Sequence, residues 1–382
     1  MILNPLSNQV GGHDGVLSMG DDNEIIVKRA LPQELKFYEE SVLHAELAAW
    51  MPTYYGTLTL TRNQPGQAGD QSSTSGVPTI KALNGYALSD MMAASTLGQQ
   101  DGANAVATAM AEADDTAAEA EDNDANDDEC ICLENVSLGF KKPCVLDLKM
   151  GTQLYDDDAP EEKKARLGAV AANSTSLPLG FRMTGFEVYD SEKDDFTKYS
   201  KHYGKGLSED TVLDGFRAYF AAKLGSDRMR LIIERFVNDL TDFLATIETQ
   251  ELRMRSSSLL MIYEGDTEAF DAGLAIEQEK IAAVVARAQA HMEKGAREDQ
   301  EGDDDDEDNE DDDEDDEDFE DYDEDDEEDG EVGQKVTDMR LIDFGHSTWT
   351  PGQGPDEGVV KGVKSALALF EKLLEEDYQT DV

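Results

Sequence analysis

Large apolar residues recur at helical spacing in several parts of the chain. The clearest stretch is 228–247, and its apolar face consists of Ile232, Ile233, Phe236, Val237, Leu240, Phe243 and Leu244. The same spacing predicts further helices over 31–50, 212–224, 277–297 and 358–375. Pro32 suits the first turn of the first of these helices. A stripe of this kind is typical of a helix face buried in the core.

Short runs of β-branched and other apolar residues predict strands. These runs lie at 24–28, 130–134, 143–151, 180–189, 259–263 and 339–343. Between them are stretches with few large apolar residues. A Gln/Gly/Ser/Thr-rich segment at 61–79 predicts a loop, and an Ala/Asp/Glu/Asn-rich segment at 98–129 predicts a disordered insertion.

A second disordered segment is predicted at 298–333. Within it, 28 of the 34 residues from 298 to 331 are Asp or Glu, which accounts for about half of the net charge of −54. Such a run cannot bury enough apolar surface to offset its ordering entropy. The overall field excludes direct nucleic-acid binding, because phosphates are repelled, and it favours basic proteins or cations as partners. Any anionic ligand then requires a local cationic pocket.

The three cysteines, Cys130, Cys132 and Cys144, have no disulfide-framework spacing and indicate a reducing, intracellular compartment. A C-x-C pair without a second pair does not predict a zinc site. No run of 18 apolar residues is present, so no transmembrane helix is expected, and the N-terminus does not have the pattern of a signal peptide.

Two elements, one at 28–34 and one at 134–136, suit nucleotide binding. Lys28 ends a predicted strand and Glu34 begins the next helix, an arrangement that kinases use on nucleotide phosphates. An ordinary surface pair is the alternative. After the first acidic segment, Glu134 and Val136 end a strand whose backbone groups are candidates for contact with adenine.

The segment PCVLDLKMG at 143–151 carries the strongest candidate chemistry. Asp147 and Lys149 are two residues apart on a predicted strand, so both point to one face. Val145 and Met150 are expected to face the other way or into the core. Charged neighbours on an apolar strand are costly unless they are paired or functional, and a structural ion pair remains the alternative.

Two further elements follow. LIDFGH at 341–346 contains an Asp-Phe-Gly sequence, in which Asp343 after a strand is a candidate magnesium ligand. This short pattern also arises by chance. In EEKKAR at 161–166, Lys163 and Arg166 share one face of a helix and form a candidate phosphate clamp, with a solvated helix face as the alternative.

PCVLDLKMG resembles the PxxxDxKxG signature of the inositol polyphosphate kinase family. The resemblance extends to NQVGGHDG, QELKFYE, LEN, SLPLGFRMTGFEVY, SSSLLMIYEG, LIDFGH and PDEGVVKGV, which span most of the folded chain. It implies an α+β, two-lobed fold related to protein kinases. Residues 1–136 would be the ATP-binding lobe, and residues 137–382 the catalytic and inositol-phosphate-binding lobe.

The resemblance also implies roles for individual residues. Lys28 would contact the ATP phosphates with support from Glu34, and the backbone around Glu134 and Val136 would hold adenine. Asp343 would bind Mg²⁺.

On the substrate side, Asp147 would contact the ribose and orient the attacking hydroxyl, and Lys149 would bridge substrate and transferred phosphoryl group. Lys163, Lys164 and Arg166 would contact inositol phosphate, with His346 nearby. Ser257 and Ser258 would have a packing or supporting role. Some relatives have a neutral amide in place of Arg166, which affects hydroxyl specificity.

Within the family, the segment LYDDDAPEEKKARL favours a multikinase that converts inositol tris- and tetrakisphosphates toward the pentakisphosphate. A hexakisphosphate kinase that makes pyrophosphates is the alternative. The resemblance further implies a monomer in nucleus and cytoplasm. In a different class of function, the acidic run would dock basic transcriptional regulators; it could equally be a spacer or an inhibitory mimic of the substrate.

Overall fold

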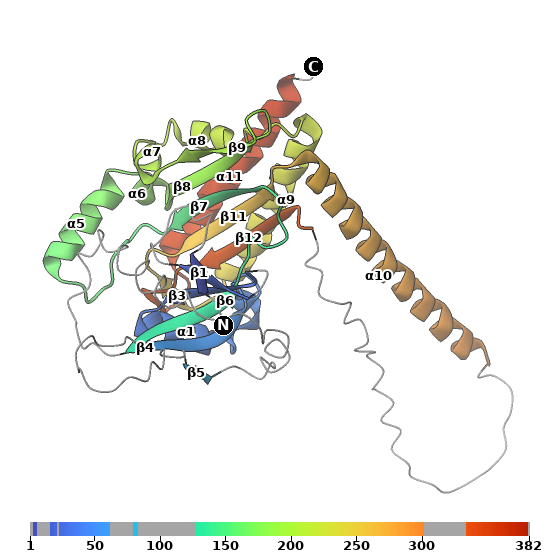
Figure 1. Ribbon diagram of the computed structural model, residues 1–382, viewed down its shortest axis with the longest axis horizontal. Helices are drawn as coiled ribbons and strands as arrows, with labels where there is room; N and C mark the ends of the chain where they lie inside the picture. Colours follow the sequence, from blue (N-terminus) through green and yellow to red (C-terminus); the bar gives the residue numbers. More distant parts are fainter. Residues whose placement is uncertain are drawn as a thin grey trace, which may run out of the picture.

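The computed structural model describes residues 3–5, 16–20, 23–61, 79–82, 127–301 and 334–380. These residues form two large antiparallel sheets, one small two-stranded sheet and helices that cover them (Figure 1). The observed mixture of helices and antiparallel sheets is the expected α+β class.

The N-terminal sheet has the strand order β1–β2–β3–β6–β4–β5. Its strands are β1 (Leu3–Pro5), β2 (Leu17–Met19), β3 (Ile25–Arg29), β4 (Tyr54–Thr61), β5 (Thr79–Ala82) and β6 (Asp127–Glu134). Apolar residues of β2, β3, β4 and β6 meet in a small core of their own, which includes Val27, Leu58 and Cys132. This core fixes the register that places Lys28 opposite Ile131.

The C-terminal sheet has the order β12–β11–β7–β8–β9. Its strands are β7 (Pro143–Met150), β8 (Phe181–Asp190), β9 (Asp195–Tyr199), β11 (Ser258–Glu264) and β12 (Thr337–Ile342). On β7, Leu146, Leu148 and Met150 are fully buried in the main core. The alternate residues therefore belong to the other face of the sheet. The small sheet pairs β10 (Leu252–Met254) with β13 (Ser347–Trp349).

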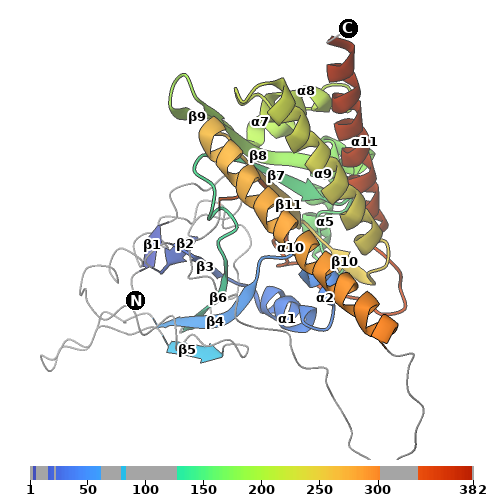
Figure 2. The ribbon, with the colours of Figure 1, turned by 90° about the vertical axis from the view of Figure 1, so that its right-hand side faces the viewer.

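Long helices cover the core face of the C-terminal sheet. Helices α9 (Ser226–Ile247) and α11 (Glu357–Thr380) pack against each other, and α11 contacts β7 and β8 (Figure 2). The remaining helices are α1 (Pro32–Ser41), α2 (Ala45–Ala48), α5 (Glu161–Ala172), α6 (Ser176–Leu179), α7 (Lys201–Lys205), α8 (Val212–Tyr219) and α10 (Thr267–Glu301). Helix α1 joins the same core, because Phe37 stacks on Phe344 at 4.6 Å and on Trp349 at 4.8 Å.

The predicted helices are present, but the residues at which they begin and end differ from the predicted ranges. The stretch 31–50 is two helices rather than one, since the chain turns at Val42 and Leu43, whose exposed fractions are 62% and 81%. Helical spacing within 31–50 predicts an apolar face that includes Val42 and Leu43 together with Leu35, Tyr38 and Leu47, and for Val42 and Leu43 this prediction was wrong. The helix predicted over 212–224 ends at Tyr219, and on α9 Val237 and Leu244 are only partly buried.

Two elements extend into segments predicted to be disordered. Strand β6 begins at Asp127, because its pairing with β4 continues to Thr61↔Asp127. Helix α10 continues to Glu301, where Ala, Glu, Lys and Gln favour helix. The rest of the two predicted disordered segments, 98–126 and 302–333, lies outside the described residues, as do residues 62–78 of the predicted loop.

Helix α10 extends away from the rest of the molecule (Figures 1 and 2). Its middle exposes Ile281, Val284 and Val285, with exposed fractions of 64%, 64% and 48%. Phe270 at its start is buried in the main core, so the core anchors only the first turns of the helix. In the described part of the chain, no helix combines the length and apolar character that crossing a bilayer requires.

Gly362→Ala is expected to destabilise the protein by about 2–4 kcal/mol. A Cβ atom at this position of α11 would overlap the carbonyl oxygen of Gly180 and lie 2.9 Å from Cε of Met150. The Gly180 carbonyl cannot shift easily, since it also accepts a hydrogen bond from the Gly151 amide at 2.8 Å. Urea unfolding measures the effect.

Gly168→Ala is the matched control. Gly168 lies inside α5 with only Tyr155 near the added methyl, at 3.9 Å. Alanine favours helix over glycine, so this variant should gain up to about 1 kcal/mol. Equal stability of Gly362→Ala and the parent protein would contradict the close approach of α11 to Gly180.

Candidate functional site

Two charged residues near the start of the chain meet a third from near its end, between the two large sheets. Lys28 near the end of β3 lies 2.9 Å from the carboxylate of Glu34 in the first turn of α1. Its Nζ donates to Oδ1 of Asp343, directly after β12, at 2.7 Å. The Lys28 side chain is only 16% exposed, which excludes the alternative of an ordinary solvated surface pair.

The charge of Lys28 is strongly stabilised. Burial by itself lowers the pKa of an amine, but the carboxylates of Asp343 and Glu34 outweigh this effect and raise the pKa of Lys28 far above its ordinary value. Lys28 is therefore a permanent cation that cannot act as a base. A buried cation held by two carboxylates is suited to contact phosphate oxygens.

Asp343 has a backbone φ of 64°, in the left-handed region that residues other than glycine rarely adopt. The next residue, Phe344, is fully buried and packs against Phe37 and Tyr38. The buried phenyl ring fixes the turn after β12. It therefore keeps the Asp343 carboxylate directed at Lys28 despite the unfavourable backbone conformation.

Asp147 and Lys149 lie on the face of β7 opposite to the main core. Asp147 is 2% exposed, and its Oδ1 has no hydrogen-bond partner. Burial raises the pKa of Asp147 to about 6; Lys149 opposes the shift and Asp343 adds to it. Nζ of Lys149 donates to the carbonyl oxygen of Ser256 at 2.7 Å instead of pairing with Asp147. The alternative of a structural ion pair between these two residues is therefore wrong.

Val145 was expected to face away from Asp147 or into the core, and this was wrong. Strand alternation places it on the Asp147 face, where it meets Val136 and Ile262 in a small apolar cluster that is separate from the main core. Phe140 and Leu260 pack against this cluster. Met150 is buried in the main core, as expected. The face of the sheet thus changes along β7 from apolar to charged.

Val136 belongs to this apolar cluster, and Glu134 precedes it by two residues at the end of β6. The Glu134 carboxylate accepts hydrogen bonds from the amide and hydroxyl of Thr53, both at 3.1 Å. Although burial raises its pKa, the Thr53 amide, Arg340 and Lys335 together lower it. The Glu134 carboxylate is thus engaged in contacts within the protein. Only the backbone around it is a candidate for contact with a flat, apolar ring placed on the cluster.

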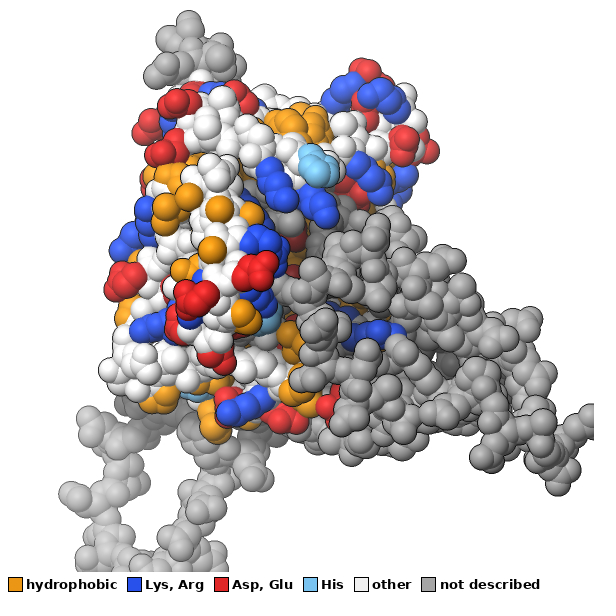
Figure 3. All heavy atoms as spheres, turned by 90° about the vertical axis from the view of Figure 1, so that its left-hand side faces the viewer, with side chains coloured by type: hydrophobic (Ala, Val, Ile, Leu, Met, Phe, Trp, Pro, Cys, Tyr) orange, Lys and Arg blue, Asp and Glu red, His pale blue; other side chains and the backbone are white. Residues whose placement is uncertain are grey.

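The cationic residues of α5 are at the surface. Lys163 and Lys164 are half-buried, Arg166 is exposed, and Lys164 also contacts Glu161 at 3.1 Å. Figure 3 shows the side of the molecule that carries α5, with Lys and Arg side chains gathered among acidic ones. The loop 151–160 connects β7 directly to α5, so the helix follows the Lys149 strand along the chain.

His346 follows Asp343 and faces the same loop. Its Nδ1 lies 2.7 Å from Oδ2 of Asp156. Ser257 and Ser258 at the start of β11 are fully buried, and their hydroxyls have no hydrogen-bond partner. Ser258 lies opposite Lys149 in the sheet. Their environment suits the packing or supporting role expected for them.

Sequence reasoning missed several residues of this region. Arg182 pairs with Lys149 across β7 and β8, and its buried NH1 atom has no partner. Burial lowers the pKa of Arg182 and Asp147 opposes that shift. Ser256 holds Lys149, and Asp156 holds His346. Arg182 and Asp156 are within conspicuous sequence segments, but only strand register and loop geometry bring them to the site.

The described residues contain no group of three or more His, Cys, Asp or Glu that would form an all-protein metal site. Mg²⁺ in phosphoryl-transfer sites is commonly held by one or two carboxylates together with phosphate oxygens. Asp343 and the unpartnered Oδ1 of the neighbouring Asp147 supply such carboxylate oxygens. The residues present therefore fit a divalent cation that is bound together with a nucleotide.

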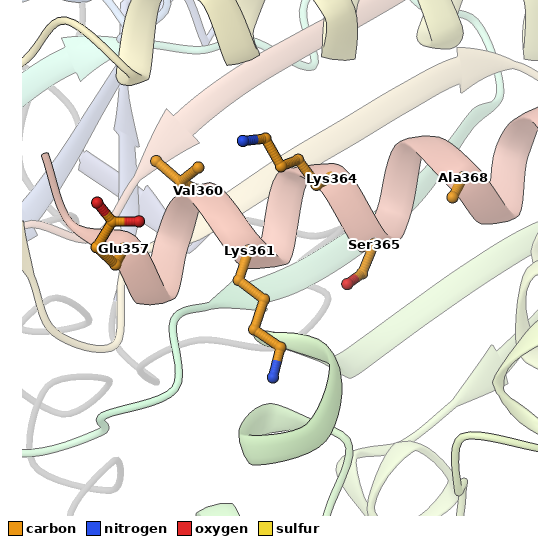
Figure 4. A pocket seen from close by; sticks show the side chains of 6 residues that line it. All are labelled: Glu357, Val360, Lys361, Lys364, Ser365 and Ala368. Atoms are coloured by element: carbon orange, nitrogen blue, oxygen red, sulfur yellow. The ribbon is translucent and has the colours of Figure 1, made fainter.

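Two surface hollows lie elsewhere. One, of about 400 Å³, runs along α11 and is lined by Glu357, Val360, Lys361, Lys364, Ser365 and Ala368 (Figure 4). Its lysines are engaged, Lys361 with the Leu177 carbonyl at 3.0 Å and Lys364 with Glu248 at 2.6 Å. The other, of about 420 Å³, is lined by residues of α8, α9 and α11. Neither includes the residues around Lys28 and Lys149.

The chain is similar in sequence to several known proteins. Residues 130–371 match the inositol polyphosphate kinase family. An inositol polyphosphate multikinase of Saccharomyces cerevisiae is 33% identical, over 96% of this chain and 97% of its own length. Human inositol hexakisphosphate kinase 1 is 31% identical, over 65% of this chain and 53% of its own length.

A solved structure has a similar fold. It is an inositol phosphate multikinase of S. cerevisiae in complex with ADP and Mn²⁺. The TM-score is 0.54 at 27% identity, and the alignment covers 92% of this chain and 99% of that one. The likeness therefore extends over both sheets.

Proposed function

Because the chain belongs to the inositol polyphosphate kinase family, we propose that it transfers the γ-phosphate of ATP to a hydroxyl of an inositol phosphate. The observation that carries this proposal is the convergence of Lys28, Glu34 and Asp343 beside Asp147 and Lys149. The first group comes from the N-terminal sheet, α1 and β12, and the second from β7. An ATP molecule that contacts both would place its phosphates between cations and carboxylates.

The chain's own residues have separable tasks in the transfer. Lys28 and Lys149 offset the negative charge of the phosphates. Asp147 orients the attacking inositol hydroxyl and accepts its proton. The hydroxyl oxygen forms a bond to the γ-phosphorus, and the bond from that phosphorus to the leaving oxygen of ADP breaks. Mg²⁺ held by Asp343 supplies further charge neutralisation on the phosphate oxygens.

The apolar cluster of Val136, Val145 and Ile262 provides the surface for adenine in this proposal. It lies beside Glu134, whose carboxylate is already occupied by Thr53. Residues 1–136 would serve as the ATP-binding lobe, with Val145 and Ile262 of the second lobe completing the adenine surface. Residues 137–382 would be the lobe that binds the inositol phosphate and performs the transfer.

We further propose multikinase specificity, from inositol tris- and tetrakisphosphates toward the pentakisphosphate. The S. cerevisiae multikinase matches almost the whole chain, whereas the human hexakisphosphate kinase matches about two thirds of it. A panel of inositol tris-, tetrakis-, pentakis- and hexakisphosphates with ATP and Mg²⁺ tests this. Formation of pentakisphosphate is the expected result, and pyrophosphate formation from the hexakisphosphate as the main reaction would assign the alternative.

Lys163→Ala/Arg166→Ala is expected to raise the KM for inositol trisphosphate about tenfold to a hundredfold, with little change in the KM for ATP. The two cations lie on the helix that follows the Lys149 strand and its loop, so they would meet the substrate rather than the nucleotide. The salt dependence of the KM should weaken as well, because fewer charges contact the substrate. Steady-state kinetics at two ionic strengths measures both effects.

Lys201→Ala/Lys205→Ala removes the same charge from α7, which packs against the core side of β8 next to Met183. This control should leave both KM values unchanged. An equal rise of the trisphosphate KM in both double variants would show that net charge, and not the α5 site, governs binding.

A second candidate function is docking of basic transcriptional regulators by the acidic run. The observation that favours it is the exposed apolar patch at the middle of α10, Ile281, Val284 and Val285, on the helix that leads into the run. Exposed apolar side chains on a helix and an acidic sequence after it suit a basic amphipathic partner.

Deletion of residues 302–331 tests this second function, with a basic amphipathic peptide as the probe. Unchanged turnover together with lost peptide binding supports docking. A lower KM for the inositol phosphate would instead assign the run as an inhibitory mimic of substrate, and no change in either property would leave it a spacer.

We also propose that the protein is a monomer located in nucleus and cytoplasm. Light scattering measures the oligomeric state, and imaging of a tagged chain shows the location.

A further inference from the structure

Asp156 is a carboxylate in direct contact with His346, a residue expected on the side of the anionic substrate. It lies in the loop between β7 and α5, and its Oδ2 is 2.7 Å from Nδ1 of His346. The side chains of His346 and Asp156 are 31% and 30% exposed, so both remain accessible to a ligand. Neither catalysis by Lys149 nor metal binding by Asp343 requires this carboxylate.

The loop around Asp156 is held in place from within. Gln153 donates its side-chain amide to the Tyr155 carbonyl at 2.9 Å and to Oδ1 of Asp157 at 2.7 Å. Leu154 next to them is buried, which anchors the loop to the body of the protein. The position of Asp156 is therefore set by local contacts on both sides of it.

The loop is also tied to the segment that holds Lys149. The hydroxyl of Ser256 donates to the Leu154 carbonyl at 3.2 Å, while the Ser256 carbonyl accepts from Lys149 at 2.7 Å. The Arg255 amide donates to the His346 carbonyl at 3.2 Å. One short segment thus fixes the Asp156–His346 pair relative to the Lys149 amine.

The contact between Asp156 and His346 sets the charge that this part of the site presents to a ligand. Because Nδ1 of His346 is turned toward Asp156, only Nε2 remains to meet a ligand. The carboxylate next to it repels a phosphate group but tolerates a hydroxyl, which carries no charge. The pair therefore makes this part of the site less positive than a histidine alone would.

We propose that Asp156 is a specificity-determining residue that disfavours a phosphate at the substrate position facing His346. Inositol phosphates with a free hydroxyl at that position are then preferred over the fully phosphorylated hexakisphosphate. This inference rests on the proposed function and assigns part of its substrate preference to one side chain.

Asp156→Asn tests the inference, since the amide keeps the shape and an oxygen that accepts from His346 but loses the charge. The ratio of kcat/KM for hexakisphosphate to that for trisphosphate should rise about tenfold. Binding of hexakisphosphate, measured by calorimetry without ATP, should tighten by a similar factor. A purely structural role would lower both kcat/KM values together and leave their ratio unchanged, which would overturn the proposal.

Asp158→Asn is the matched control, because it removes the same charge from an exposed residue of the same loop. It should leave the ratio and the calorimetric affinity as in the parent protein. An equal increase in both variants would attribute the effect to general charge and overturn the role of Asp156. Failure of the parent protein to phosphorylate trisphosphate would count against the proposed function, while the calorimetric comparison would still decide the role of Asp156.

Discussion

Asp343→Asn is expected to lower kcat by about a thousandfold, because it removes a carboxylate at the point where metal and phosphates meet. Asp343 accepts from Lys28 at 2.7 Å and follows a strand whose end is fixed by buried Phe344. The amide retains the shape but is a poor ligand for Mg²⁺. The Mg²⁺ concentration needed for half-maximal rate should therefore rise as well.

Measurement of kcat over a Mg²⁺ titration separates these effects. Asp227→Asn, at an exposed position in the first turn of α9, removes one carboxylate away from the site and should leave both quantities nearly unchanged. A kcat within tenfold of the parent value in Asp343→Asn, with the same Mg²⁺ dependence, would rule out Asp343 as the ligand.

Asp147→Asn is expected to abolish most of the activity and to stabilise the fold at the same time. Loss of a positioned proton acceptor typically costs about a hundredfold to ten-thousandfold in rate. Burial raises the pKa of Asp147 from 3.8 to about 6 in the folded protein. The charged carboxylate therefore destabilises the ligand-free fold at neutral pH, and the uncharged amide removes this cost.

The contribution of Asp147 to the free energy of unfolding depends on pH in a definite direction. Between about pH 4 and 6 the folded state holds a proton on Asp147 that the unfolded state has released, so the contribution of Asp147 to stability falls as pH rises. The stability of Asp147→Asn relative to the parent should accordingly increase over this range, by about 2–3 kcal/mol in total. Urea unfolding without ATP or metal measures it. A difference that is constant from pH 4 to 8 would contradict the raised pKa.

Much of the site was predictable from sequence because strand alternation is a simple rule. It placed Asp147 and Lys149 on one face of β7, and helical spacing located the buried face of α9. The rule also assigns Val145 to the Asp147 face. The failure there came from assuming that an apolar residue must face the main core, whereas the site has an apolar cluster of its own.

The contacts that complete the site depend on tertiary structure. Lys28 and Asp343 are separated by 315 positions, and no local pattern indicates that their side chains meet. The same holds for Lys149 and Ser256, 107 positions apart, and for the Asp156–His346 pair. The short strands β10 and β13 have three residues each, too few for a periodic signal, and they form only because their chain segments are brought together.

The reaction proposed for this site is transfer of the γ-phosphate of ATP to an inositol hydroxyl. The most direct measurement incubates the purified chain with γ-labelled ATP, Mg²⁺ and inositol trisphosphate, and compares it with Lys149→Ala. We expect labelled tetrakis- and pentakisphosphate from the parent chain and little or none from the variant. Absence of labelled inositol product from the folded parent chain, or equal product from both chains, would contradict it.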